Sequence, residues 1–110
     1  MKTLSMYAWG KVHPMTFETD SYAENGNLYV GLRTNIEGYP EPWSDLTVNL
    51  GVPCKENHAF IDTNNNGNGI IDWLVENELG ELTGRIKASG FCMYPEFKFN
   101  MEKLMEYVTE

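Results

Sequence analysis

Residues that could bind a metal ion are few in this sequence. The soft ligands are His13, Cys54, His58 and Cys92, of which Cys54 and His58 are separated by only three residues. Two thiolates and two imidazoles suit a tetrahedral zinc site, so one structural zinc is a candidate cofactor. Paired C-x₂-C spacings are missing, so the alternative is a pair of buried free thiols and two ordinary surface histidines.

The stretch AFIDTNNNGNGIIDW, residues 59–73, raises the question of a calcium site. Counted from Asp62, its oxygen-bearing residues and a glycine occupy positions 1, 3, 5 and 6 of an EF-hand loop. Position 12, which requires a carboxylate, is Trp73, and Asp72 comes one place too early. Aspartate and asparagine also stabilise turns by bonding to their own backbone. We therefore favour a strand-to-helix turn with a capping asparagine over a calcium site.

Catalytic chemistry has little support in the sequence. Cys92 could act as a nucleophile with His13 or His58 as its base, but no orienting motif accompanies such a pair. The GNG at residues 67–69 lacks the lysine of a phosphate-binding loop. We therefore expect a protein that is not an enzyme, and a hydrolase using Cys92 is the least favoured alternative.

The charge balance points to a class of partner. The chain has 110 residues, with 16 acidic against 8 basic side chains and a net charge of −8. Such a charge disfavours direct binding to nucleic acid or to an anionic membrane. It suits the basic surface of a protein that itself binds nucleic acid.

Two acidic stripes could form such a contact. Glu102, Glu106 and Glu110 recur every four residues near the end of the chain, and Asp72 and Glu76 have the same spacing earlier. Like charges four residues apart destabilise a helix by roughly 0.2–0.5 kcal/mol per pair. Either the stripes engage a basic surface, or they are solvated faces whose small cost is tolerated.

A second possible contact lies in the segment EGYPEPW. Tyr39 and Trp43 stand there on a loop stiffened by two prolines, and exposed aromatic side chains are good anchors in protein interfaces. The alternative is that Trp43 folds back onto the core.

The elements that position these residues follow from apolar periodicity. Strands are expected at residues 5–9 and 15–19, separated by GKVHP, and then at 27–35, 46–50, 58–62 and 94–100. The strand at 46–50 is expected to pair with the strand at 27–35. Residues 37–45 contain two prolines and are expected to form a loop. Helices are expected at residues 68–79, ended by Gly80 in the C′ position, and at 101–110, capped by Asn100. The prediction is a single α+β domain over residues 1–110, with a mostly antiparallel sheet of about five strands and two helices packed on one face.

The N-terminus carries no signal-peptide pattern, so we expect a cytoplasmic protein.

Several phrases resemble a family of small bacterial proteins, numbered 4313 among the domains of unknown function. They are NGNL at residues 25–28, LTVNL at 46–50, AFIDTNN at 59–65, TGR at 83–85 and SGFCMYP at 89–95. The resemblance runs from about residue 20 to the end and excludes His13. It implies no catalytic residue. It implies a setting in plasmids, conjugative elements and phages of gut bacteria, where small acidic proteins often act against defence systems.

The leading hypothesis is therefore a small acidic inhibitor of a nucleic-acid-handling defence protein. It would be an anti-CRISPR protein against a Cas9-type nuclease, or an anti-restriction protein, and would block nucleic-acid binding. The alternative is a zinc-stabilised or purely structural accessory protein of a plasmid, phage or conjugative element.

Overall fold

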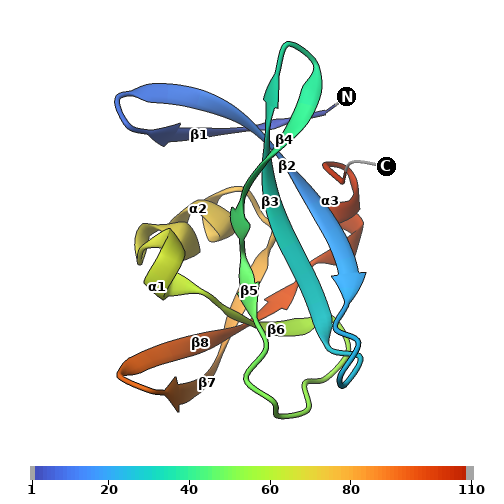
Figure 1. Ribbon diagram of the computed structural model, residues 1–110, viewed down its shortest axis with the longest axis vertical. Coiled ribbons are helices and arrows are strands. Elements are labelled where there is room, and N and C mark those ends of the chain that lie inside the picture. Colours follow the sequence, from blue (N-terminus) through green and yellow to red (C-terminus); the bar gives the residue numbers. More distant parts are fainter. Residues whose placement is uncertain (1, 109–110) are drawn as a thin grey trace.

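The computed structural model describes residues 2–108, within which the chain forms two four-stranded antiparallel sheets and three short helices (Figure 1). The first sheet has the order β1-β2-β3-β4, with β1 at Leu4–Ala8, β2 at Lys11–Ser21, β3 at Leu28–Ile36 and β4 at Tyr39–Asp45. The second has the order β5-β6-β8-β7, with β5 at Thr47–Val48, β6 at His58–Ile61, β8 at Cys92–Phe99 and β7 at Gly80–Ser89. The helices are α1 at Thr63–Asn66, α2 at Gly69–Glu76 and α3 at Met101–Met105.

A mixed fold with mainly antiparallel strands was predicted and is confirmed, whereas the prediction of about five strands and two helices is wrong for the described residues. The first sheet contains two hairpins, β1–β2 and β3–β4. The first is longer than expected, because GKVHP lies largely inside β2. The two-residue turns of both hairpins, Trp9–Gly10 and Glu37–Gly38, have positive φ at both positions, as the right-handed twist of a hairpin requires.

The largest error concerns residues 37–45, which were predicted to form a loop because of Pro40 and Pro42. They include β4, in which Pro40 lies opposite Asn35 and Pro42 opposite Arg33. β4 is the last strand in the order of the first sheet, so a proline there can direct its missing N–H away from the ladder. β7 was not predicted either, because nearly all of its side chains are exposed and Gly84 interrupts the alternation of Leu82, Ile86 and Ala88 with polar residues.

The two sheets are joined where β4 passes into β5. The Leu46 N–H donates to the Val30 carbonyl in the first sheet, and the Leu46 carbonyl accepts from the Asp62 N–H beside the second sheet. The predicted pairing of residues 46–50 with the strand at 27–35 is therefore confined to the start of that segment, at Leu46. Leu46 is fully buried in the core between the sheets, as are Phe17 and Phe97.

The predicted helix at residues 68–79 is confirmed as α2, which buries Ile70 and Leu74. The predicted helix at residues 101–110 is wrong in length, because α3 ends at Met105 and Glu106 is its C-cap. The Tyr107 carbonyl then accepts a hydrogen bond from the Phe17 N–H on β2. This contact with the first sheet, together with burial of Tyr107, draws the chain out of helical geometry.

The segment after β6 is a turn that contains the short helix α1. The Asp62 carboxylate accepts a hydrogen bond from the Asn65 N–H and so caps α1. The capping residue is therefore Asp62, whereas Asn68, the N-cap of α2, makes no side-chain cap. Asn66 donates to the Asp45 and Asp62 carbonyls. These polar groups bond to one another and to the backbone, as the turn interpretation expected.

No helix in residues 2–108 is long and apolar enough to cross a membrane.

Candidate functional site

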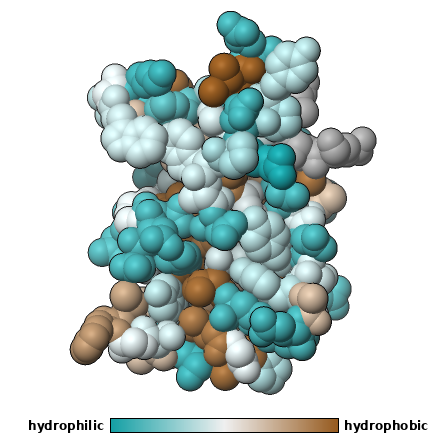
Figure 2. Space-filling model, viewed as in Figure 1, coloured by the Kyte–Doolittle hydropathy of each residue, from teal (hydrophilic) through white to brown (hydrophobic). Residues whose placement is uncertain are grey.

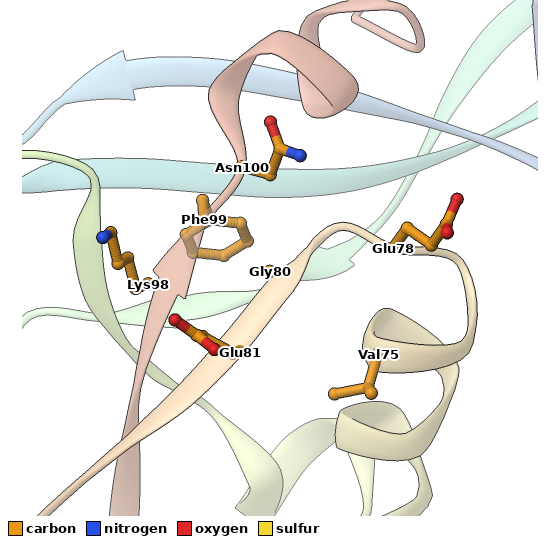
Figure 3. Close-up of a pocket in the computed structure, with 7 residues that line it drawn as sticks. All are labelled: Val75, Glu78, Gly80, Glu81, Lys98, Phe99 and Asn100. Carbon is orange, nitrogen blue, oxygen red and sulfur yellow. The ribbon is translucent and has the colours of Figure 1, made fainter.

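A depression of about 520 Å³ lies between α2, the start of β7 and the end of β8 (Figure 3). We call it the acidic depression, and it is lined by Val75, Glu78, Gly80, Glu81, Lys98, Phe99 and Asn100. Its apolar surface comes from Val75, which is exposed, and from Phe99. Two carboxylates and one ammonium group supply its charge.

The shape of the depression depends on Gly80, which has a φ of 149°. A Cβ atom at this position would overlap the Lys98 carbonyl oxygen and the Phe97 ring. The absence of a side chain therefore lets β7 begin its pairing with β8, where Gly80 lies opposite Phe99. The prediction that Gly80 is the C′ residue of α2 is wrong, because the left-handed residue after the helix is Glu78, with a φ of 62°.

Four exposed carboxylates lie on α2 and on the segment that follows it. Asp72 and Glu76 are four residues apart on the helix, and Glu78 and Glu81 line the depression. None of the four takes part in an ion pair within residues 2–108. The only basic side chain that lines the depression is Lys98, which lies opposite Glu81 in the strand register.

Glu76 and Glu78 stand where they oppose folding, whereas Asp72 lies in the first turn of α2, where the helix dipole favours a negative charge. Asp72 and Glu76 repel each other at a cost of roughly 0.2–0.5 kcal/mol. Glu76 is the last residue of α2, where the helix dipole disfavours a negative charge. The left-handed backbone of Glu78 costs about 1 kcal/mol relative to glycine, which helices prefer in this place. The sequence thus keeps negative charge on this surface at the expense of stability.

The second predicted stripe is not a continuous helical face. Glu102 is exposed on α3, but Glu106 follows the helix and pairs with Lys2. That contact lowers the pKa of the Glu106 carboxyl below its usual range and raises the pKa of Lys2. Glu110 lies outside the described residues. Glu106 still has helical φ and ψ, and the contact of Tyr107 with β2 takes the chain out of the helix after it.

Of the two predicted aromatic contacts, Tyr39 is 72% exposed at the start of β4. Trp43 is half-buried, because its ring packs against His13 and Trp9 with centroid distances of 4.9 Å in both cases. The alternative prediction was that Trp43 folds back onto the core. Its ring does pack against the core and is also held by neighbouring rings on the first sheet.

The four predicted zinc ligands are not brought together. No three His, Cys, Asp or Glu side chains within residues 2–108 gather in a way that could hold a metal ion. The His13 Nε2 donates to the Ala8 carbonyl at 3.0 Å, and the His58 Nδ1 donates to the Glu56 carbonyl at 2.7 Å. Cys54 and Cys92 are free thiols, and burial raises the pKa of Cys54. The four residues do not form a tetrahedral centre. The two imidazoles lie on different sheets, His13 on β2 and His58 on β6, and each bonds to a nearby backbone carbonyl.

Cys92, the candidate nucleophile, begins β8 and is half-buried. A hydrogen bond with Cys92 raises the pKa of the Tyr94 hydroxyl.

Sequence reasoning missed the depression itself. Its Glu78, Glu81 and Lys98 meet only because β7 pairs with β8, and β7 was not predicted. The sequence did show Gly80 between Glu78 and Glu81. We interpreted this glycine as the end of a helix, whereas it allows two strands to approach closely.

Comparison with known proteins supplies a family but no activity. A family model described as a domain of unknown function, DUF4313, matches residues 16–110. No curated protein and no solved structure matches the chain. The match covers both sheets apart from β1 and the first residues of β2, and it includes the whole acidic depression. The chain therefore belongs to the DUF4313 family.

Proposed function

We propose that this protein is a non-enzymatic inhibitor that binds a basic, nucleic-acid-binding surface of another protein and blocks its access to nucleic acid. The proposal depends on the exposed carboxylates of Asp72, Glu76, Glu78 and Glu81, which form no ion pair within residues 2–108. Negative charge is kept there despite its cost to folding. A basic partner would pair with these carboxylates, and the attraction would contribute to the binding free energy.

The acidic depression suits a lysine or arginine side chain. The methylene stem of such a side chain would lie along Val75 and the edge of Phe99, and its charged head would meet either Glu78 or Glu81, whose carboxylates point to different sides in Figure 3. Arginine is the better fit, because its planar guanidinium can bond to a carboxylate through two N–H groups. Asp72 and Glu76 would extend the contact to neighbouring basic residues.

The partner we propose is a defence protein that handles nucleic acid, most specifically a Cas9-type nuclease or a restriction enzyme. Such proteins hold the backbone of a guide or target in a positively charged channel. A net charge of −8 matches that surface. The expected genomic setting of the family agrees with such a partner. The carboxylates would occupy the lysines and arginines that otherwise contact phosphates.

A gel-shift assay tests the proposal directly. Guide-loaded Cas9 is bound to labelled target DNA while this protein is titrated in, and the assay is repeated with a restriction enzyme on its site. Loss of the shifted complex near a stoichiometric ratio is the expected result. If neither enzyme loses its DNA at any ratio, the proposed block is wrong and a purely structural accessory role becomes the better hypothesis.

Matched charge reversals separate the acidic depression from net charge. The double variant Glu78→Lys and Glu81→Lys should weaken inhibition roughly tenfold or more, equivalent to about 1.4 kcal/mol of binding free energy. The control is Glu24→Lys with Glu56→Lys, which changes the net charge equally at exposed positions away from the depression. Equal loss in both variants would attribute the effect to overall charge and not to this site.

A further inference from the structure

A second cavity, of about 880 Å³, lies between the β1–β2 hairpin and the helices α1 and α2. We call it the aromatic groove, because all three tryptophans of the chain, Trp9, Trp43 and Trp73, line it. Its opposite side is formed by the asparagine run Asn64–Asn66 and the start of α2. Figure 1 shows the blue β1–β2 hairpin above the helices α1 and α2, and residues from both line the groove.

Trp9 is the most unusual residue of the groove. Its side chain is 83% exposed at the tip of the hairpin, and its backbone has a left-handed φ of 50°. A bulky residue seldom adopts this conformation, and a turn of this kind normally uses asparagine, aspartate or glycine. The chain therefore places a large indole in solvent, at a position that favours other residues.

Neighbouring groups hold the tryptophan rings in place. Trp9 packs on Trp43 with a centroid distance of 4.9 Å and an angle of 31° between the rings. The edge of His13 supports Trp43, and the Trp73 Nε1 donates to the Ser5 carbonyl at 2.9 Å. Although Trp9 packs on Trp43 and has an edge contact with His13, it remains 83% exposed and so keeps open ring surface for a ligand.

The polar side of the groove combines fixed and free groups. Ser44 donates to the Asn66 amide oxygen at 2.6 Å, which fixes Asn66. The Asn65 amide nitrogen donates to Asp62, whereas the Asn65 amide oxygen and the Asn64 side chain form no hydrogen bond within residues 2–108. Free amide groups therefore line the same groove as the indoles.

Among residues 2–108, no charged side chain lines this groove, although the chain has 16 acidic and 8 basic residues. Its size falls within the range of about 300–1,000 Å³ that is typical of sites for small molecules. Aromatic faces, amide groups and the absence of charge together define a neutral ligand with both an apolar face and hydroxyl groups.

We propose that the aromatic groove binds a neutral oligosaccharide. The C–H-bearing face of a sugar ring would pack on the open face of Trp9, and its hydroxyl groups would hydrogen-bond to Asn64 and Asn65. This site is separate from the acidic depression and independent of the proposed function.

Other ligand classes fit the groove less well. A nucleic-acid strand would bring phosphates to a chain of net charge −8, with no basic residue in the groove to receive them. A quaternary ammonium group prefers several aromatic faces around one point, whereas Trp9 and Trp43 cover each other. An apolar peptide side chain would leave the free amide groups without partners.

The experiment begins with an immobilised panel of neutral oligosaccharides, built from glucose, mannose, galactose or N-acetylglucosamine units. The intact protein is applied, and any ligand found is titrated while tryptophan fluorescence is recorded. Since all three tryptophans line the groove, a ligand there should shift the emission. Binding by no member of the panel, or binding without a change in emission, would overturn the proposal.

Matched variants identify the site. Trp9→Ala should weaken binding at least tenfold, and Asn64→Ala should weaken it severalfold. Tyr39→Ala removes a similarly exposed aromatic residue at the tip of the other hairpin, outside the groove, and should bind like the parent. Unchanged binding in both groove variants, with folding verified by circular dichroism, would contradict the assignment. Glu78→Lys with Glu81→Lys should retain sugar binding, which separates this test from that of the proposed function.

Discussion

The acidic depression and the aromatic groove share one helix and differ in their chemistry. Val75 of α2 lines the depression, whereas Ile70 and Trp73 of the same helix line the groove. Three of the seven residues that line the depression are charged, and none of those that line the groove is. Figure 2 shows one face of the molecule, on which hydrophobic side chains are exposed between hydrophilic ones.

In one respect the two regions are alike. Each presents a side chain from a non-glycine residue with positive φ, Glu78 beside the depression and Trp9 beside the groove. Such backbone conformations cost about 1–3 kcal/mol and collect at functional sites. The difference lies in what each side chain offers, and it predicts opposite behaviour in salt. Binding at the depression should weaken as salt is raised, and binding at the groove should not.

The most damaging single change should be Gly80→Ala. The added methyl group would overlap the Lys98 carbonyl, so the start of β7 must move away from β8. We expect a loss of about 3 kcal/mol in the free energy of unfolding, measured by chemical denaturation. Wild-type stability would show that the close approach of these strands does not shape the depression. Gly10→Ala, at an open position with positive φ, is the control for backbone strain alone.

A milder change should loosen only the groove. Asp62→Ala removes the cap of α1 and the partner of the Asn65 amide nitrogen. Loss of an N-cap costs about 1 kcal/mol, which thermal unfolding would detect. The asparagine run would then be less well held, so tryptophan emission should change while inhibition through the depression persists. Equal effects on both sites would mean that they are coupled through α2.

The replacement Glu78→Gly should separate stability from binding. Glycine tolerates the left-handed backbone, so the variant should gain about 0.5–1 kcal/mol in the free energy of unfolding. The same variant removes a carboxylate from the depression and should inhibit less well. A gain in stability with full inhibition would remove Glu78 from the proposed interface. Glu37→Gly repeats the backbone change at a hairpin turn outside both cavities and serves as control.

The smallest expected effect on stability comes from the hydroxyl of Tyr29, which lies outside both sites and titrates only at alkaline pH. Burial, followed by a hydrogen bond to Asp45, raises the pKa of its hydroxyl above the ordinary value. The unfolded state should therefore lose this proton first as pH rises, so stability should fall above about pH 10. Tyr29→Phe should flatten that fall, as measured by urea unfolding between pH 9 and 11. An unaltered slope would assign the effect to other groups.

The sequence predicted elements whose periodicity reflects burial. α2 was found from Ile70 and Leu74, and the strand at residues 27–35 from Leu28, Val30 and Leu32. β7 was missed because most of its side chains are exposed and Gly84 interrupts its alternation, so the apolar pattern is weak. β4 escaped because proline excludes a central strand but not the outer side of an edge strand.

The candidate site was predicted only in part, for a related reason. Asp72 and Glu76 were recognised because they are four residues apart on one predicted helix. Glu81 and Lys98 are 17 residues apart and meet through strand register, which side-chain spacing along the chain does not reveal. The helix that carries Glu102 is shorter than predicted, because burial of Tyr107 overrode helical propensity after Glu106.

The passage of the chain from β4 into β5 has a consequence for cooperativity. Leu46 donates to Val30 on one side and accepts from Asp62 on the other, so the backbone ladder is continuous from one sheet to the next. Neither sheet can open fully without breaking this shared segment. The amide protons of Leu46 and Asp62 should therefore exchange with deuterium only through global unfolding, at the same rate and with the same denaturant dependence.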